Sequence, residues 1–96
     1  MMSSITASEL IKIMDRVSII DIRSIENYNR NHIPKAVNIP WETLLVQPEK
    51  YLSKRETYYI YCQKGIRTKQ VCNILANNGY RVVHIIGGYE EWLLAQ

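Results

Sequence analysis

Residues 58–68 read Tyr-Tyr-Ile-Tyr-Cys-Gln-Lys-Gly-Ile-Arg-Thr, and they carry the strongest structural signal in the chain. Residues 58–61 favour a β-strand, Gly65 favours a tight loop, and Thr68 is expected to open a helix. Cys62 therefore stands at a strand-to-helix turn. Such a turn presents unpaired backbone N–H groups and the positive end of the helix dipole, which together favour an anion. The stretch predicts a cysteine held as the thiolate, which is its nucleophilic form.

Strand-like and helix-like segments alternate on both sides of this stretch. Runs of β-branched and apolar residues predict strands at 17–22, 36–39, 58–61 and 82–86. Capping signals and helical spacing predict helices at 6–14, 24–30, 40–52 with a break at Pro48, 68–77, and from Gly87-Gly88 to the C-terminus. This alternation predicts an α/β fold with a mainly parallel sheet.

Length, composition and charge limit the classes of protein that need to be considered. The chain has 96 residues, 22% of them charged, and a formal net charge of +3. This length predicts a single domain spanning residues 1–96. No Lys/Arg-rich run indicates a nucleic-acid partner, and no long apolar run indicates a membrane partner. Without an apolar N-terminal targeting segment, a cytoplasmic location is expected.

The two cysteines differ in their expected roles. Cys62 and Cys72 match neither a metal-ligand spacing nor a Cys-x-x-Cys motif, so no metal site is predicted. Cys72 lies on an apolar helical stripe with Val71 and Leu75, and packing in the core is its expected role. Cys62, in a glycine-containing loop with Lys64 and Arg67 nearby, is the candidate nucleophile.

Three segments are expected to meet around one crevice. Asp21-Ile22-Arg23, Cys62 and Gly87-Gly88 each follow a predicted strand, and ligands of open α/β sheets collect beyond the carboxyl ends of the strands. Asp21 and Arg23 are expected to pair with neighbouring groups rather than touch substrate. Arg67 has two open interpretations, binding an anionic donor or hydrogen-bonding the carbonyls of the loop.

The length of the cysteine loop separates two chemistries. Cysteine phosphatases share a cysteine, five intervening residues and an arginine, whose wide ring of N–H groups surrounds a phosphate. Counted from Cys62, that position holds Thr68, and the arginine comes one residue earlier, at Arg67. The shorter loop encloses a smaller pocket, which suits a single sulfur atom on the cysteine better than a phosphate. Phosphatase activity is therefore disfavoured.

The motifs taken together resemble those of a single-domain rhodanese, in the family's order and over nearly the whole chain. The matching segments are Asp21-Ile22-Arg23, the run His32-Ile33-Pro34-Lys35-Ala36-Val37-Asn38-Ile39-Pro40, the loop Cys62-Gln63-Lys64-Gly65-Ile66-Arg67-Thr68, and Gly87-Gly88 followed by Trp92. The resemblance implies a five-stranded parallel sheet flanked by helices. It also implies Cys62 as the sulfur-accepting nucleophile, residues 63–68 as the active-site loop, and Asp21, Arg23 and His32 in support. A structural hydrogen bond is the expected role of His32.

The resemblance further implies a two-step transfer of sulfane sulfur. Thiosulfate or a similar anionic donor would leave a persulfide on Cys62, and cyanide, a small thiol or a protein thiol would remove it, without metal or organic cofactor. The alternative is a sulfur-relay or docking module for a dedicated protein partner, which an exposed apolar patch beside Cys62 would favour. Gln63-Lys64 replaces the family's usual Arg-Ser pair, so the donor preference does not carry over.

Three aromatic residues complete the sequence-based expectations. Tyr61 is interpreted as a strand residue, and because it directly precedes Cys62, a place at the mouth of the pocket is the alternative. Trp41 and Trp92 are both expected to anchor the apolar core.

Overall fold

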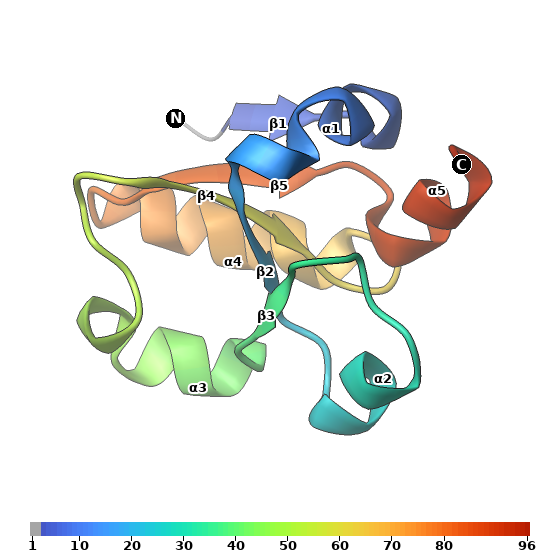
Figure 1. The fold of residues 1–96 in the computed structure, drawn as a ribbon. Coiled ribbons are helices and arrows are strands. Elements are labelled where there is room, and N and C mark those ends of the chain that lie inside the picture. The colour runs from blue at the N-terminus through green and yellow to red at the C-terminus, as the bar shows by residue number, and fades with distance from the viewer. Residues whose placement is uncertain (1–2) are drawn as a thin grey trace.

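The computed structural model describes residues 3–96, which form a five-stranded sheet with helices on both faces (Figure 1). The strands are β1 (Ser3–Ile5), β2 (Ser18–Asp21), β3 (Val37–Asn38), β4 (Thr57–Tyr61) and β5 (Arg81–Ile85), in the spatial order β1-β5-β4-β2-β3. Every neighbouring pair of strands is parallel. The α/β fold and the parallel sheet that the sequence predicts are confirmed.

The helices pack in pairs on the two faces of the sheet. They are α1 (Ala7–Ile13), α2 (Ile25–Arg30), α3 (Trp41–Val46), α4 (Ile66–Asn77) and α5 (Gly88–Leu94), with short 3₁₀ turns η1 (Met14–Arg16) and η2 (Pro48–Lys50). Helices α3 and α4 cover one face, α1 and α5 cover the other, and α2 lies beyond the end of β2 (Figure 1). None of the helices within residues 3–96 is both long and apolar enough to cross a membrane.

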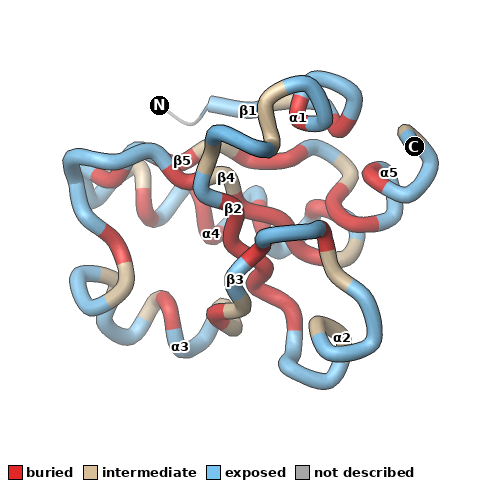
Figure 2. The backbone as a smooth tube through the Cα atoms, viewed as in Figure 1, coloured by how far each residue is buried: buried red, intermediate tan, exposed pale blue. Residues whose placement is uncertain are grey.

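Strand β4 and the residue directly after it contribute side chains to two apolar clusters, one on each face of the sheet. Ile60 and Cys62 belong to the cluster beneath α3 and α4, whereas Tyr59 and Tyr61 pack into the cluster beneath α1 and α5. Successive side chains of a strand point to opposite faces, which explains the division. Figure 2 shows that buried residues follow one another along the central strands of the sheet. Tyr61 is fully buried on the face opposite Cys62, so the expectation of a place at the pocket mouth is wrong.

Helix capping explains where two of the helices begin. Thr6 caps α1, because its hydroxyl accepts a 3.1 Å hydrogen bond from the Glu9 amide while the Glu9 carboxylate accepts one of 2.9 Å from the Thr6 amide. This reciprocal arrangement is the capping box that the sequence predicts. Ser24 caps α2 by accepting a 3.3 Å hydrogen bond from the Asn27 amide, again as expected.

The structure corrects the sequence-based elements in two places. Strand β1 is missing from the sequence-based assignments, because Ser3 and Ser4 are exposed at the sheet edge and carry no apolar alternation. Helix α4 begins at Ile66 rather than at Thr68. Gly65 acts as its N-cap with a φ of 93°, a left-handed conformation that glycine adopts without steric cost. The helix N-terminus therefore lies closer to Cys62 along the chain than expected.

Candidate active site

Cys62 lies directly after β4, and its sulfur accepts hydrogen bonds from two backbone amides. The Sγ atom is 3.2 Å from the Gly65 nitrogen and 3.4 Å from the Thr68 nitrogen. Both amides belong to the loop and first turn of α4, whose first N–H groups have no partner within the helix. Only 7% of Cys62 is exposed. The arrangement places a sulfur atom where negative charge is stabilised and water access is limited.

Backbone hydrogen bonds from the first turn of α5 also hold the loop around Cys62 in position. The carbonyl oxygen of Cys62 accepts a 2.8 Å hydrogen bond from the Tyr89 amide, and that of Gln63 accepts one of 3.1 Å from the Glu90 amide. Gly88 has a φ of 64°, and a Cβ atom there would collide with the Cys62 carbonyl. Gly87-Gly88 thus lies against the backbone of the cysteine loop, in a contact that a larger residue at position 88 would block, but neither glycine lines the cavity in front of Cys62.

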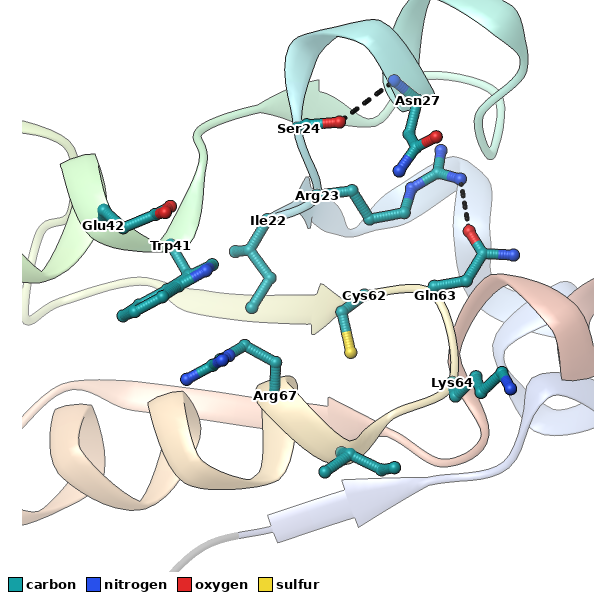
Figure 3. A pocket seen from close by; sticks show the side chains of 11 residues that line it. Ile22, Arg23, Ser24, Asn27, Trp41, Glu42, Cys62, Gln63, Lys64 and Arg67 are labelled. Atoms are coloured by element: carbon teal, nitrogen blue, oxygen red, sulfur yellow. Dashed lines mark hydrogen bonds between the residues drawn. The ribbon is translucent and has the colours of Figure 1, made fainter.

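An open cavity of about 360 Å³ lies in front of Cys62 (Figure 3). It is bounded by the end of β2, the start of α2, the start of α3 and the cysteine loop. Its lining residues are Ile22, Arg23, Ser24, Asn27, Trp41, Glu42, Cys62, Gln63, Lys64, Ile66 and Arg67. Cys62 and four members of the predicted loop 63–68 thus line the cavity, while Gly65 and Thr68 direct their amides at the sulfur.

A buried ion pair stands beside this cavity. The Arg23 guanidinium donates hydrogen bonds of 2.8–3.1 Å to the carboxylate of Asp21, which is fully buried. Burial opposes the charge of Arg23, but the hydrogen bonds and charge of Asp21 outweigh it, so the pKa of Arg23 is raised. Asp21 and Arg23 were each expected to pair with a neighbouring group, and the structure shows that they pair with each other. Arg23 also lines the cavity, which the pairing alone did not indicate.

Tyr61, whose side chain lies on the face of the sheet opposite Cys62, belongs to the same hydrogen-bond network as Asp21 and Arg23. Its hydroxyl donates a 2.6 Å hydrogen bond to Asp21 Oδ2 and accepts one of 3.1 Å from the Ile33 amide. Burial, followed by the hydrogen bond and negative charge of Asp21, raises the pKa of Tyr61 far above its ordinary value. The phenol therefore remains neutral and serves as a donor to the carboxylate.

The Arg67 side chain lies against Trp41 and Gln70. Its guanidinium carbon lies 4.1 Å from the centroid of the Trp41 ring, and one of its nitrogens donates a 3.4 Å hydrogen bond to Gln70. Within residues 3–96 it makes no hydrogen bond to a loop carbonyl, so the expectation of a carbonyl brace is wrong. Figure 3 shows the side chain extending toward Trp41 and forming one wall of the cavity with it.

The remaining candidates lie outside the cavity. His32 Nδ1 is 2.8 Å from the Tyr28 carbonyl oxygen, and the two rings stack at 3.8 Å, which agrees with a structural hydrogen bond. Cys72 is fully buried, and burial, followed by the proximity of Cys62, raises the pKa of its thiol to about 12. Its expected place in the core is confirmed. Within residues 3–96, no group of His, Cys, Asp and Glu side chains could hold a metal ion.

Several lining residues were missed from the sequence. Ser24 was recognised only as a helix cap, and nothing in the pattern marks Asn27 or Glu42. Ile22 and Trp41 are apolar residues, and the sequence places such residues in the core rather than at a cavity. The expected core role is confirmed for Trp92, which is buried. Trp41 is half-buried: it packs against the core cluster beneath α3 and α4 and also lines the cavity, which its expected core role did not indicate.

Comparisons with known proteins agree with this geometry. A family model described as the rhodanese-like domain matches residues 6–95. The chain is 34% identical over 91 residues to the thiosulfate sulfurtransferase GlpE of Coxiella burnetii, covering 94% of this chain and 83% of that protein. It is 32% identical over 92 residues to the putative sulfurtransferase YtwF of Bacillus subtilis, covering 94% and 86%. The crystal structure of SSP1007 from Staphylococcus saprophyticus has a TM-score of 0.87 and 35% identity, covering 95% and 93% of the two chains.

The parallel sheet and the cysteine loop at its carboxyl edge thus define an α/β protein of the class to which named sulfurtransferases belong. More particularly, the chain belongs to the rhodanese-like domain family, as its motifs implied.

Proposed function

We propose that this protein moves a sulfane sulfur from thiosulfate, or a similar small anionic donor, to a thiophilic acceptor through a persulfide on Cys62. The observation that carries the proposal is the pair of amide hydrogen bonds to Cys62 Sγ at the floor of an open cavity. The cationic side chains of Lys64 and Arg67 on the cavity wall would attract an anionic donor.

The transfer balances without an external oxidant or reductant. In the first step the Cys62 thiolate attacks the outer sulfur of thiosulfate, the sulfur–sulfur bond of the donor breaks, and its electron pair leaves with sulfite. In the second step cyanide or a thiolate attacks the outer sulfur of the persulfide. The bond to Cys62 then breaks, and its electron pair restores the thiolate.

The residues around Cys62 have separate parts in this cycle. The amides of Gly65 and Thr68 stabilise negative charge on Sγ before and after transfer, because they already point at the sulfur and need no reorganisation. The Asp21–Arg23 pair holds the end of β2 beside the loop. Cys72 stays a protonated thiol at neutral pH and takes no part.

Intact-mass analysis after incubation with thiosulfate tests the proposal. The wild type should gain the mass of one sulfur atom, and addition of cyanide should remove it. Cys62→Ser should gain nothing while remaining folded, and Cys72→Ser is the matched control that keeps the gain. A sulfur adduct that survives in Cys62→Ser would refute the assignment. A persulfide that forms but turns over slowly with cyanide and small thiols would favour the relay or docking alternative.

A further inference from the structure

A second, smaller pocket adjoins the cavity in front of Cys62. Its volume is about 170 Å³, which is below the roughly 300–1,000 Å³ that is usual for pockets enclosing a whole organic ligand. It therefore suits one group of a ligand whose remainder lies elsewhere. We call it the arginine pocket, and its lining residues are Arg23, Asn27, Arg30, Asn31, Gln63 and Tyr89.

The arginine pocket and the larger cavity share a wall. Arg23, Asn27 and Gln63 line both of them, whereas Cys62 lines only the larger cavity. Figure 3 shows the three shared side chains grouped on one side of that cavity, with Arg23 bonded to Gln63. A ligand whose sulfur reacts at Cys62 could therefore reach past the shared wall and place a second group in the arginine pocket.

The lining of the arginine pocket is suited to an anion. Two of its residues carry guanidinium groups, three carry amides and one carries a phenol, and none is acidic. All of these groups can donate hydrogen bonds. The carboxylates that bond lining residues, those of Asp21 and Glu90, lie outside the lining and are already engaged by Arg23 and Gln63.

Arg23 keeps one hydrogen-bond donor that the fold does not use. A guanidinium has five N–H groups. Within residues 3–96, Nε bonds Asp21, Nη2 bonds Asp21 and the Asn31 carbonyl oxygen, and Nη1 bonds only Gln63. The second N–H of Nη1 thus has no acceptor among the described residues. Because Asp21 offsets the charge of Arg23, this side chain offers a fixed donor rather than a net charge.

Arg30 supplies the net positive charge of the pocket. It is exposed, and its guanidinium donates a 3.4 Å hydrogen bond to Asn27, three residues earlier on α2. Within residues 3–96 it forms no ion pair. An exposed arginine is common on protein surfaces, but this one lines a pocket together with the buried guanidinium of Arg23.

Tyr89 provides an independent sign that the pocket accepts a ligand. The residue is only 8% exposed, and its ring lies under the Arg23 guanidinium, with the guanidinium carbon 4.4 Å from the ring centroid. Its hydroxyl makes no hydrogen bond within residues 3–96. Polar groups of buried side chains normally have a partner, so a phenol that lines a pocket without one is available to a ligand.

We propose that the arginine pocket binds the carboxylate of a thiol acceptor, so that sulfur leaves Cys62 fastest toward thiols that carry a carboxylate. The planar carboxylate would lie against the guanidinium of Arg30, the free N–H of Arg23 and the hydroxyl of Tyr89. This inference rests on the sulfur transfer proposed above and concerns its second step.

The anchored acceptor reacts without any further reagent. Its thiolate attacks the outer sulfur of the Cys62 persulfide, and a new sulfur–sulfur bond forms between acceptor and outer sulfur. The bond to Cys62 breaks, and its electron pair restores the Cys62 thiolate. The acceptor leaves as an organic persulfide, which takes the outer sulfur with it.

Single-turnover removal of sulfur from the loaded protein tests this inference. The protein is loaded with thiosulfate, freed of excess donor and mixed at constant ionic strength with matched thiols, and intact mass follows the loss of sulfur. The pairs are mercaptoacetate with mercaptoethanol, mercaptopropionate with mercaptopropanol, and mercaptobutyrate with mercaptobutanol. Reaction of the same thiols with free cysteine persulfide gives the intrinsic rate ratio of each pair.

The carboxylate-to-alcohol ratio should depend on chain length. Because the arginine pocket does not include Cys62, we expect the ratio to rise from mercaptoacetate to mercaptobutyrate. At the best length it should exceed the intrinsic ratio by about tenfold, the lower end of the contribution of a charge-assisted hydrogen bond, since Arg30 is exposed to solvent. General attraction by the basic side chains around the cavity would instead raise all three ratios alike.

Arg30→Gln removes the charge of the pocket and should lower the ratio at the best length by about threefold or more. The fold should persist, because Arg30 is exposed and glutamine can still bond Asn27. Arg55→Gln is the matched control. It removes one exposed arginine as well, but from the loop before β4, at the opposite end of that strand from Cys62. Its ratios should equal those of the wild type.

The outcomes separate this inference from the function on which it rests. If thiosulfate leaves no sulfur atom on Cys62, the proposed sulfur transfer itself is wrong. If the protein loads but the ratios stay at their intrinsic values, or rise equally at every chain length, only the carboxylate site is wrong. The same holds if Arg30→Gln leaves the ratio unchanged or lowers it no more than Arg55→Gln does. A length-dependent preference lost in Arg30→Gln and kept in Arg55→Gln supports the site.

Discussion

Arg23 donates a 3.0 Å hydrogen bond from its guanidinium to the side-chain oxygen of Gln63, the residue directly after Cys62. The amide group of Gln63 in turn donates a 3.2 Å hydrogen bond to the Glu90 carboxylate on α5. Gln63 therefore connects the buried ion pair at the end of β2 to the first turn of α5. The loop that carries the candidate nucleophile is held on both sides by a single side chain.

Replacing Gln63 by leucine should remove both connections while preserving the size of the side chain. Loss of two partly exposed hydrogen bonds is expected to lower the free energy of unfolding by only about 1 kcal/mol. Persulfide formation with thiosulfate should slow several-fold, because the loop is less well positioned. Glu90→Gln, which retains an acceptor for the Gln63 amide, is the control with a rate near wild type. An unaltered rate in Gln63→Leu would mean that the backbone bonds alone position the loop.

Tyr61→Phe should destabilise the protein without touching the cavity. The substitution removes the hydroxyl that bonds Asp21 and the Ile33 amide, and it leaves that buried amide without its partner. An unsatisfied buried donor costs about 1–3 kcal/mol, and we expect a fall of this size in the free energy of unfolding from urea titration. Tyr59→Phe on the same strand is the control, since its hydroxyl makes no hydrogen bond within residues 3–96. Equal losses in the two variants would contradict this reading of the network.

The two cysteines should react differently with an alkylating reagent. At pH 8 the Cys72 thiol remains protonated, since its pKa is raised to about 12, and its side chain is fully buried. Iodoacetamide should therefore modify the native protein once, at Cys62, and should reach Cys72 only after unfolding. Peptide mapping after timed quenching measures both sites. Comparable modification of Cys72 in the native protein would place it outside the core.

His84 on β5 should make stability depend on pH in mildly acid solution. Burial, followed by the charge of Lys69, lowers the pKa of its imidazole below the ordinary value of 6.5. The unfolded chain then binds a proton more readily than the folded chain does. The contribution of neutral His84 to the free energy of unfolding is therefore complete above about pH 6.5. It is lost as the pH falls through the lower pKa that His84 has in the folded protein. Urea titrations between pH 8 and pH 5 should show this decline in the wild type. His84→Leu should show a shallower one, and identical pH profiles would exclude His84 as the cause.

Local patterns were sufficient for the central architecture and for the cysteine loop. The strand at 58–61, the loop through Gly65 and the helix after it can be predicted because each has its own propensity signal within a few residues. The alternation of β4 would also have placed Tyr61 opposite Cys62, had the period of two been applied across the end of the strand. Ser3 and Ser4 give no such signal, because an exposed edge strand pairs through its backbone alone.

The walls of the cavity could not be predicted in the same way. Trp41 and Arg67 are far apart in sequence, and their stacking depends on how α3 packs against α4. Gln63 meets Arg23 only because β2 and β4 are neighbours in the sheet. These contacts arise from tertiary packing, which neither residue type nor spacing encodes locally.

A crystal structure of the protein after treatment with thiosulfate is the most direct test of sulfur transfer at Cys62. It should show one additional sulfur atom bonded to Cys62 Sγ and lying in the cavity between Trp41 and Gln63. The amides of Gly65 and Thr68 should still point at the inner sulfur. An unmodified Cys62, or a sulfur atom bound to Cys72 instead, would contradict the account.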